Sequence, residues 1–160
     1  MRIPVQVLVE MYQNSLYVVA FSICKNTADA QDVVQDTFLQ YHSKQIQFNN
    51  EQHIRAWLFK VAINKAKNIN RSFWRRNRQS LEDYMKIASF ETPDLSDVFQ
   101  AVMNLPEKYR IVIHLYYYED YAINEIADVL DLSVSNVKVR LSRGRKLLKE
   151  TLKEGWDDDE

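Results

Sequence analysis

Glycine and proline are scarce in this chain, and their scarcity constrains its fold class more than any other feature. Two glycines and three prolines in 160 residues leave few positions for hairpins or tight turns. Apolar residues recur at spacings of three and four, the spacing of helices that are buried along one side. We therefore expect an all-α protein, with helices at about 5–24, 28–46, 51–77, 96–104, 107–118, 122–131 and 134–152.

The helical pattern weakens between Gln79 and Asp97, which makes this stretch the expected domain boundary. Thr92-Pro93-Asp94 supplies turn chemistry there, and the proline disfavours helix in the residue before it. No internal repeat relates the two halves. The sequence predicts two small helical domains, at residues 1–78 and 97–153, with a linker at 79–96 and an acidic tail at 154–160.

The composition limits the class of protein further. An apolar content of 46% is sufficient for real cores, so a disordered chain is not expected. The single cysteine, Cys24, argues against a disulfide scaffold or a thiolate metal site and fits a reducing compartment. The N-terminus lacks a signal-peptide pattern, and we expect no apolar run near the roughly 20 residues that span a bilayer. A cytoplasmic protein without membrane insertion is predicted.

Charge is distributed very unevenly along the chain. The formal net charge of −1 predicts no nucleic-acid partner by itself. However, Arg55 to Arg78 contains eight basic residues and no acid, and Leu132 to Lys149 contains six basic residues and no acid. The acids gather in Asp29 to Asp36 and after Lys149. Any nucleic-acid function must therefore come from the two basic stretches.

The second basic stretch predicts a DNA-reading helix. If Ser133 caps it, Val134, Val137, Leu141 and Leu148 fall on one face, which must be buried. Short side chains and long cations share the other face, as suits a recognition helix in a major groove. A solvated basic face is the alternative. The outward residues are Ser135, Val139, Ser142, Arg143 and Lys146, with Lys138 and Arg140 flanking them.

The preceding segment supports that interpretation. With Ile126, Ala127 and Leu130 facing inward, residues 122–131 would pack across the basic helix. Two helices joined by so short a turn predict a helix-turn-helix.

The first basic stretch predicts a second nucleic-acid surface. Lys60, Asn64, Lys67, Arg71 and Arg78 form one narrow stripe on a helix. Trp57, Phe59, Phe73 and Trp74 lie nearby, and aromatics among cations suit stacking on unpaired bases. Trp57 aligns with Ile54, Leu58 and Val61, however, so a core position is favoured for it. For Phe73 and Trp74 the sequence does not decide between a core position and stacking on bases.

The segment DAQDVVQDTF, residues 29–38, predicts a surface of opposite sign. A helical projection buries Ala30, Val34, Phe38 and Tyr41. An apolar leucine within an acidic face suits a protein contact, although a solvated acidic face is equally compatible with the pattern. A metal site is disfavoured because the acids project from one helix without a histidine. The outward residues are Asp29, Asp32, Gln35, Asp36 and Leu39.

Three segments together carry a family resemblance. DAQDVVQDTF, RAWLFKVAINKAKN (55–68) and LPEKYRIVIHLYYYEDYAINEIADVLDLSVSNVKVRLSRGRKLL (105–148) resemble, in order and spacing, an extracytoplasmic-function (ECF) sigma factor, group IV of the sigma-70 family. The resemblance covers roughly residues 8–152. It implies sigma region 2 and region 4 joined by a flexible linker, binding to core RNA polymerase and promoter DNA, and no catalysis, cofactor or metal.

The resemblance also implies residue roles. Asp32, Gln35, Asp36 and Leu39 match positions that dock on the clamp helices of the polymerase β′ subunit. Asn64 matches a segment that captures flipped minus-10 bases, and Lys67 and Arg71 are able to hold the DNA backbone. Lys60 belongs to the same minus-10 set. The helix from Lys108 to Tyr118 would help to meet the β flap, and the resemblance implies an anti-sigma factor as a further partner. The minus-35 set is Ser135, Asn136, Lys138, Val139, Arg140, Ser142, Arg143 and Lys146, of which Ser135, Asn136 and Arg140 suit phosphate contacts.

Two departures from the family pattern concern the helix-turn-helix. Asp131 stands where the family often has glycine, but aspartate tolerates left-handed backbone geometry better than most residues. Val139 and Ser142 are short, so they do not reveal which minus-35 sequence is read.

Two other classes of function compete with the sigma factor. A stand-alone helix-turn-helix regulator would leave the acidic face and the first basic stretch unexplained. An enzyme is disfavoured because the sequence has no phosphate-binding glycine loop, no paired nucleophile and base, and only scattered histidines, His42, His53 and His114.

Overall fold

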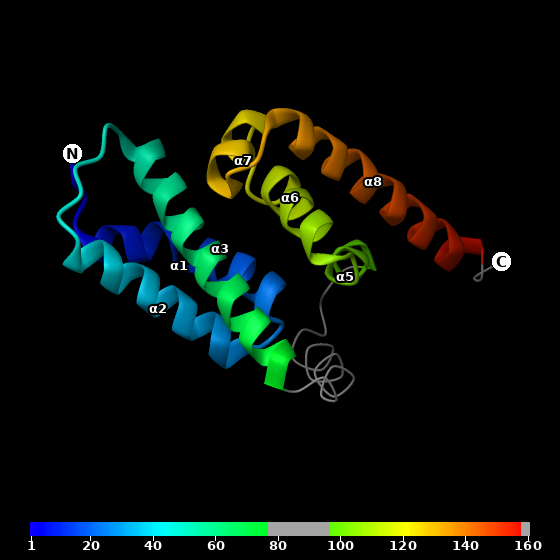
Figure 1. Cartoon of the computed structure of the whole chain (residues 1–160), viewed down its shortest axis with the longest axis horizontal. Coiled ribbons are helices and arrows are strands. Elements are labelled where there is room, and N and C mark those ends of the chain that lie inside the picture. Colours follow the sequence, from blue (N-terminus) through cyan, green and yellow to red (C-terminus); the bar gives the residue numbers. More distant parts are fainter. Residues whose placement is uncertain (77–96, 158–160) are drawn as a thin grey trace. The chain divides into compact units, whose positions relative to one another are not determined.

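The computed structural model describes residues 1–76 and 97–157, in which α-helix is the regular secondary structure throughout (Figure 1). The chain divides into two compact units, the first containing α1–α3 and the second α5–α8. The predicted all-α fold in two helical parts is confirmed. The predicted linker at 79–96 lies outside the described residues. The helices are α1 (Val5–Cys24), α2 (Thr27–Ser43), α3 (Glu51–Arg76), α5 (Asp97–Met103), α6 (Glu107–Tyr117), α7 (Ile123–Leu130) and α8 (Val134–Asp157).

Two helix ends differ from the predicted positions by three residues or more. α2 ends at Ser43 instead of 46, because the Arg2 guanidinium donates hydrogen bonds to the carbonyls of Tyr41, Lys44 and Ile46 and holds that segment. α8 continues to Asp157 instead of ending at 152. No proline or left-handed residue interrupts it, since positive backbone φ values among the described residues occur only at Lys25, Asp120 and Asp131.

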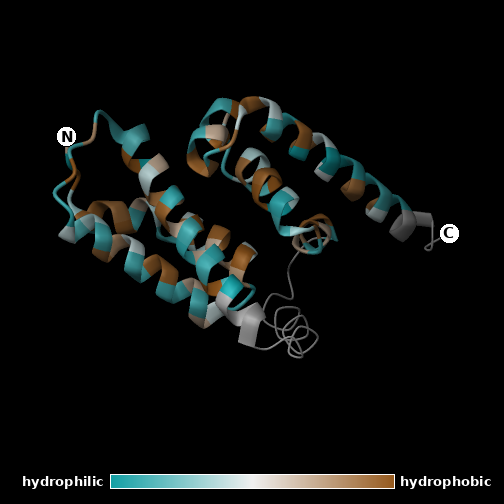
Figure 2. Cartoon of the chain, viewed as in Figure 1, coloured by the Kyte–Doolittle hydropathy of each residue, from teal (hydrophilic) through white to brown (hydrophobic). Residues whose placement is uncertain are grey.

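Each helix of the first unit has one apolar side, and Figure 2 shows apolar and polar residues interleaved along them. Leu8, Leu16 and Val19 of α1 are fully buried, and α1 packs against both α2 and α3. The expectation that no apolar run could span a bilayer is wrong, because α1 is long and apolar enough by length and composition. Its packing against two other helices accounts for that hydropathy.

Trp57 belongs to an aromatic cluster at the seam of α2 and α3. Its ring meets Tyr41 and Phe48 edge-on, with centroid distances of 6.2 Å and 5.9 Å. Tyr41 and Phe48 are buried, whereas Trp57 is half-buried. Edge-to-face packing of this kind stabilises a core, so the core interpretation of Trp57 is supported.

The second unit is organised around α6, whose residues 110–115 are all buried. Among them is Arg110, which donates hydrogen bonds to the carbonyls of Met103 (3.2 Å) and Leu105 (3.0 Å). These carbonyls follow the end of α5, where a helix leaves acceptors without partners. A buried arginine therefore joins α5 to α6, a role that the sequence pattern did not indicate.

The buried stripe of α8 differs from the predicted one at its start. Val137 and Leu141 are buried and Leu148 is half-buried, as expected. Val134, predicted to be buried, is 38% exposed, because it is the first residue of the helix and lies before α8 meets the core. Gly144 is also buried, about one helical turn after Leu141. In α7, Ile126 and Ala127 are buried as predicted, but Val129 is buried and Leu130 only half-buried.

Gly144 sets the closest approach between α6 and α8. A Cβ atom at this position would lie 2.9 Å from Cγ1 of Ile113 and 3.5 Å from Cβ of Tyr109. Ile113 is 1% exposed and cannot move aside without disturbing the core. Glycine at this position therefore reflects helix packing rather than backbone flexibility.

We expect Gly144→Ala to destabilise the second unit. Alanine favours helix over glycine by roughly 1 kcal/mol, but overpacking at Ile113 costs about 1 to 3 kcal/mol, so a net loss of about 1 kcal/mol should appear in urea unfolding. Ser142→Ala, at an exposed position of the same helix, is the control and should be neutral or slightly stabilising. Equal gains for both variants would contradict the close packing.

The imidazole of His114 in α6 is completely buried. Its Nε2 lies 3.9 Å from a Glu119 carboxylate oxygen, and neither ring nitrogen has a hydrogen-bond partner among the described residues. Burial lowers the pKa of His114 from 6.5 to about 4. The unfolded chain therefore binds a proton between these pH values that the folded chain does not bind.

Stability of the second unit should consequently fall as the pH drops below 6.5. From pH 7 to pH 5 the His114 contribution is a loss of about 2 kcal/mol. Urea titrations of the full chain, followed by NMR signals of α6, should show this loss, and His114→Leu should lack it. An identical pH dependence in both proteins would show that His114 is accessible to protons in the folded state.

Candidate functional site

The bend between α7 and α8 has the geometry of a helix-turn-helix. Asp131 adopts the left-handed conformation (φ 55°, ψ 44°), as expected for aspartate in the position that often holds glycine. The Leu132 amide donates to the Ala127 carbonyl at 2.9 Å. The Ser133 hydroxyl then accepts from the Asn136 amide at 3.1 Å, which confirms the predicted cap of α8.

The outward side of α8 carries the residues predicted to face DNA. Arg140 and Asn136 are half-buried, and the Arg140 Nε donates to the Asn136 side-chain oxygen at 3.1 Å. The bond fixes both side chains along one flank of the helix. Val139 is 45% exposed, so an apolar side chain stands among the cations. The other exposed members of the predicted set are Ser135, Lys138, Ser142, Arg143 and Lys146.

Arg143 has a partner that sequence reasoning missed. Its guanidinium lies beside the Tyr109 side chain, and this interaction is the main reason that the pKa of the Tyr109 phenol lies below its usual value. Lys108 also contributes, with its ammonium 5.0 Å from the centre of the Tyr109 ring. α6 thus contacts Arg143 from one side, whereas the hydrogen bond of Arg140 to Asn136 lies within α8. The close approach of α8 to α6 at Gly144 brings Tyr109 near Arg143.

The predicted stripe on α3 lies opposite a buried face. Asn64 and Arg71 are exposed, and Lys60 and Lys67 are half-buried. Phe59 is buried beneath the Arg55 guanidinium, 5.6 Å from the ring centre, and is not available for base stacking. The side chains of Phe73 and Trp74, as well as Arg78, lie outside the described residues.

The acidic side of α2 is exposed over most of its length. Leu39 is 63% exposed, and Asp32, Gln35 and Asp36 are exposed beside it. The Asp36 carboxylate lies 3.6 Å from the Lys65 ammonium of α3. Since Lys65 is next to Asn64 in sequence, the acidic face of α2 and the basic stripe of α3 meet at this ion pair.

Asp29 does not belong to that exposed surface, contrary to the expectation. It is half-buried, and this burial, with a smaller contribution from Asp32, raises the pKa of its carboxyl group. Its amide donates to the Asn26 side chain at 2.9 Å, which caps α2. Asp29 is in the first turn of the helix, where a negative charge interacts favourably with the N-terminal end of the helix dipole.

The described residues include no group of three or more side chains able to hold a metal ion. His42, His53 and His114 come from three different helices, α2, α3 and α6.

Comparison with known proteins identifies the two units. Residues 8–80 match the family description "Sigma-70 region 2", and residues 95–148 match "Sigma-70, region 4". The chain belongs to the sigma-70 family. Similar curated proteins are the ECF RNA polymerase sigma factor SigW of Bacillus subtilis, 25% identical over 92% of this chain and 88% of the relative, and the ECF RNA polymerase sigma-E factor of Escherichia coli K12, 29% identical over 76% and 73%.

Two solved sigma factor structures are similar as well. CnrH, in complex with the cytosolic domain of CnrY, matches with a TM-score of 0.67 and 29% identity over 94% of this chain and 88% of that chain. RpoE of Bartonella quintana, in complex with the anti-sigma factor NepR, matches in fold with a TM-score of 0.72 and 24% identity, covering 92% and 96%.

This sigma factor is an alternative, ECF-type transcription initiation factor. It binds core RNA polymerase and directs promoter recognition, and it is not an enzyme. The presence of region 2 before region 4 excludes the stand-alone helix-turn-helix regulator, which would have no use for region 2.

Proposed function

We propose that this sigma factor divides promoter recognition and polymerase binding among three exposed helix faces. The clamp face of α2 (Asp32, Gln35, Asp36, Leu39) docks on the clamp helices of the β′ subunit. The minus-10 face of α3 (Lys60, Asn64, Lys67, Arg71) binds the melted minus-10 element. The minus-35 face of α8 (Ser135, Asn136, Lys138, Val139, Arg140, Ser142, Arg143, Lys146) lies in the major groove of the minus-35 element.

The minus-35 assignment has the strongest support, namely the division of α8 into two sides. Its inward side is buried at Val137, Leu141 and Gly144, while the outward side holds cations and short side chains. A helix with one side committed to the core and the other basic and exposed suits a major groove. The capped turn at Ser133 presents the first turn of α8 to the DNA.

On the minus-10 face we assign base reading to Asn64. Its exposed amide offers both a donor and an acceptor, which reading the edge of an extruded base requires. Lys67 and Arg71 follow Asn64 at spacings of three and seven, so they share its side of α3 and suit the backbone of an unpaired strand.

The β-flap contact is proposed for the helix from Lys108 to Tyr118. Residues 110–115 are buried, which leaves Lys108 at one end and Tyr117 and Tyr118 at the other as exposed candidates. The Arg145 Nε of α8 donates to the Tyr117 hydroxyl at 2.6 Å. The bond orients an aromatic side chain that is 51% exposed.

The domain limits follow from the same assignment. We assign region 2 to residues 1–78, a linker to 79–96, region 4 to 97–153 and an acidic tail to 154–160. The matched ranges 8–80 and 95–148 support this division. The protein acts where the polymerase acts, so we assign it to the cytoplasm.

We also propose that an anti-sigma factor holds this protein inactive. The support is that RpoE of Bartonella quintana was solved in complex with the anti-sigma factor NepR, and that CnrH, which is 29% identical, was solved in complex with the cytosolic domain of CnrY. An inhibitor acts most economically by covering both DNA-binding surfaces, the minus-10 face and the minus-35 face.

Polymerase docking can be tested by changing the clamp face. The double variant Asp36→Lys with Leu39→Ala reverses a charge and removes an apolar anchor on an exposed surface, so it should weaken core binding at least tenfold. Binding of the full chain to purified core enzyme is measured by fluorescence anisotropy. Glu150→Lys, an exposed charge reversal in α8, is the control and should bind normally. Normal binding by the double variant would overturn the clamp assignment.

The minus-35 face predicts two different behaviours for two arginines. Arg143, which lies beside Tyr109, should contact base edges, so Arg143→Ala should cost on the order of 1 to 3 kcal/mol and relax preference at one position. Arg140, held along the flank by Asn136, should contact phosphate. Arg140→Ala should weaken binding about equally on every sequence and reduce the salt dependence by roughly one unit of slope.

Residues 97–160 are titrated onto variant minus-35 duplexes over a salt series to separate the two behaviours. If both substitutions weaken every duplex alike, α8 contacts only the backbone and has no sequence-reading role.

A further inference from the structure

The charge of α8 changes sign along its length. Residues 134–149 contain six basic residues and no acid, whereas residues 150–160 contain six acids and one lysine. The basic part carries the proposed minus-35 face. The acidic part takes no part in the DNA contacts proposed for α8.

The acids within the helix are in line with the residues proposed to read DNA. At 100° per residue, positions 150, 154 and 157 fall within about 40° of Arg143 around the helix axis. They therefore continue the minus-35 face beyond Lys146. Lys153 is about 80° from Arg143, so it borders these acids without lying among them. Glu150 is exposed. The acidic stripe is defined as Glu150, Glu154 and Asp157.

The acidic stripe is fixed in line with the minus-35 face. α8 is one uninterrupted helix from Val134 to Asp157, about 36 Å long. Along its axis, Glu150 lies about 10 Å and Asp157 about 21 Å beyond Arg143. If the whole of α8 lay flat on DNA, the stripe would face phosphates that carry one charge per roughly 1.7 Å of duplex. Repulsion would then be strong, because the separation would be shorter than the Debye length of about 8 to 10 Å.

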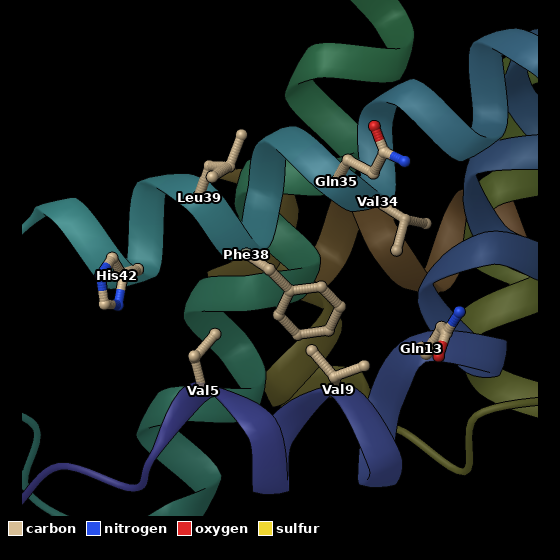
Figure 3. Close-up of a pocket in the computed structure, with 8 residues that line it drawn as sticks. All are labelled: Val5, Val9, Gln13, Val34, Gln35, Phe38, Leu39 and His42. Carbon is tan, nitrogen blue, oxygen red and sulfur yellow. The ribbon is translucent and has the colours of Figure 1, made fainter.

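An acidic surface can also bind a protein, but the acidic stripe has no apolar anchor of the kind that such contacts use. The clamp face of α2 shows the difference. Its Leu39 is 63% exposed and lies beside an apolar groove of about 560 Å³ between α1 and α2 (Figure 3). In α8, no large apolar side chain between residues 140 and 153 is exposed. Position 156, a tryptophan, is about 140° from Arg143 and so falls on another side of the helix. The stripe therefore suits repulsion better than docking.

We propose that the acidic stripe is a specificity determinant that keeps the C-terminal part of α8 away from DNA. The inference rests on the proposed minus-35 assignment and explains why only about three turns of α8 enter the groove. In the specific complex, those turns are in the groove and the stripe is lifted clear of the phosphates. On non-specific DNA, α8 is held by phosphates alone and samples flat orientations, in which the stripe is repelled. The acids therefore weaken non-specific binding more than specific binding.

The test removes the charge of the acidic stripe and keeps the size of its side chains. Glu150→Gln, Glu154→Gln and Asp157→Asn are combined in the full chain, since these amides have helix propensities close to those of the acids. Affinity for a scrambled duplex should rise about tenfold, and affinity for a duplex selected by the unmodified protein from a random pool about twofold. The ratio of specific to non-specific affinity should thus fall about fivefold. Fluorescence anisotropy measures both affinities.

A matched variant removes three negative charges elsewhere in the second unit. Asp97→Asn, Asp120→Asn and Asp128→Asn change exposed residues outside α8. The net charge changes by the same amount, so both affinities should change by the same factor and their ratio should stay constant. Far-UV circular dichroism checks that both variants fold.

The position of the helix end is measured separately. Thr151→Cys, at an exposed position of α8, carries an iron chelate that cleaves DNA close to it, while the native Cys24 is buried and stays unlabelled. Removing the charge of the stripe should increase cleavage of bound scrambled duplex about threefold, because the helix end then approaches the phosphates.

Arg143→Ala separates the acidic stripe from the minus-35 assignment. If this variant loses affinity for the selected duplex, but the stripe variant changes the ratio no more than the matched variant, the stripe proposal is overturned and the minus-35 assignment stands. If Arg143→Ala binds the selected duplex like the unmodified protein, both are overturned. A lower ratio without more cleavage from position 151 also overturns the stripe proposal, because the helix end has not moved. A lower ratio together with more cleavage supports it.

Discussion

The close packing of α8 against α6 is the contact on which the second unit depends. Gly144 permits it, because a side chain at that position would overlap buried Ile113. The same approach brings Tyr109 within reach of Arg143, so the packing of the core and the placement of a candidate base-reading side chain have one cause. A helix meant to enter a DNA groove must be held firmly from behind, and here the support comes from the most tightly packed part of the unit.

In the first unit, α2 and α3 are likewise packed into the core on one side and exposed on the other. α2 buries Val33, Val34 and Phe38, and the proposed clamp face is exposed on its opposite side. α3 buries Ile54 and Leu58 and leaves Asn64 outward. The ion pair between Asp36 and Lys65 lies where the two outward surfaces meet. The proposed protein-binding and DNA-binding faces are therefore adjacent on one small helical unit, although their charges are opposite.

The sequence alone predicted the helical architecture, the division into two units and the exposed side of α2, because the period of apolar residues determines which side of a helix is buried. It also predicted the left-handed bend at Asp131 and the Ser133 cap, which depend on local chemistry. It was wrong for two residues whose position along the helix matters more than the side they face. Val134 is on the buried side of α8 by helical projection but lies before the helix meets the core. Asp29 is on the exposed side of α2 by projection but is in the capped first turn. Arg110 and Tyr109 were missed, because their roles arise from contacts between helices that no single helical projection contains.

The outward and inward sides of α8 share almost no residues, and this has a consequence for how such proteins diversify. Val139, Ser142 and Lys138 are exposed and contribute nothing to the buried stripe, so exchanging them changes stability very little. Under the proposed minus-35 assignment, exchanges at these positions can therefore change the promoter that is read while region 4 stays folded. Arg143 is the exception, since its interaction with Tyr109 means that an inherited change there also alters a contact with α6.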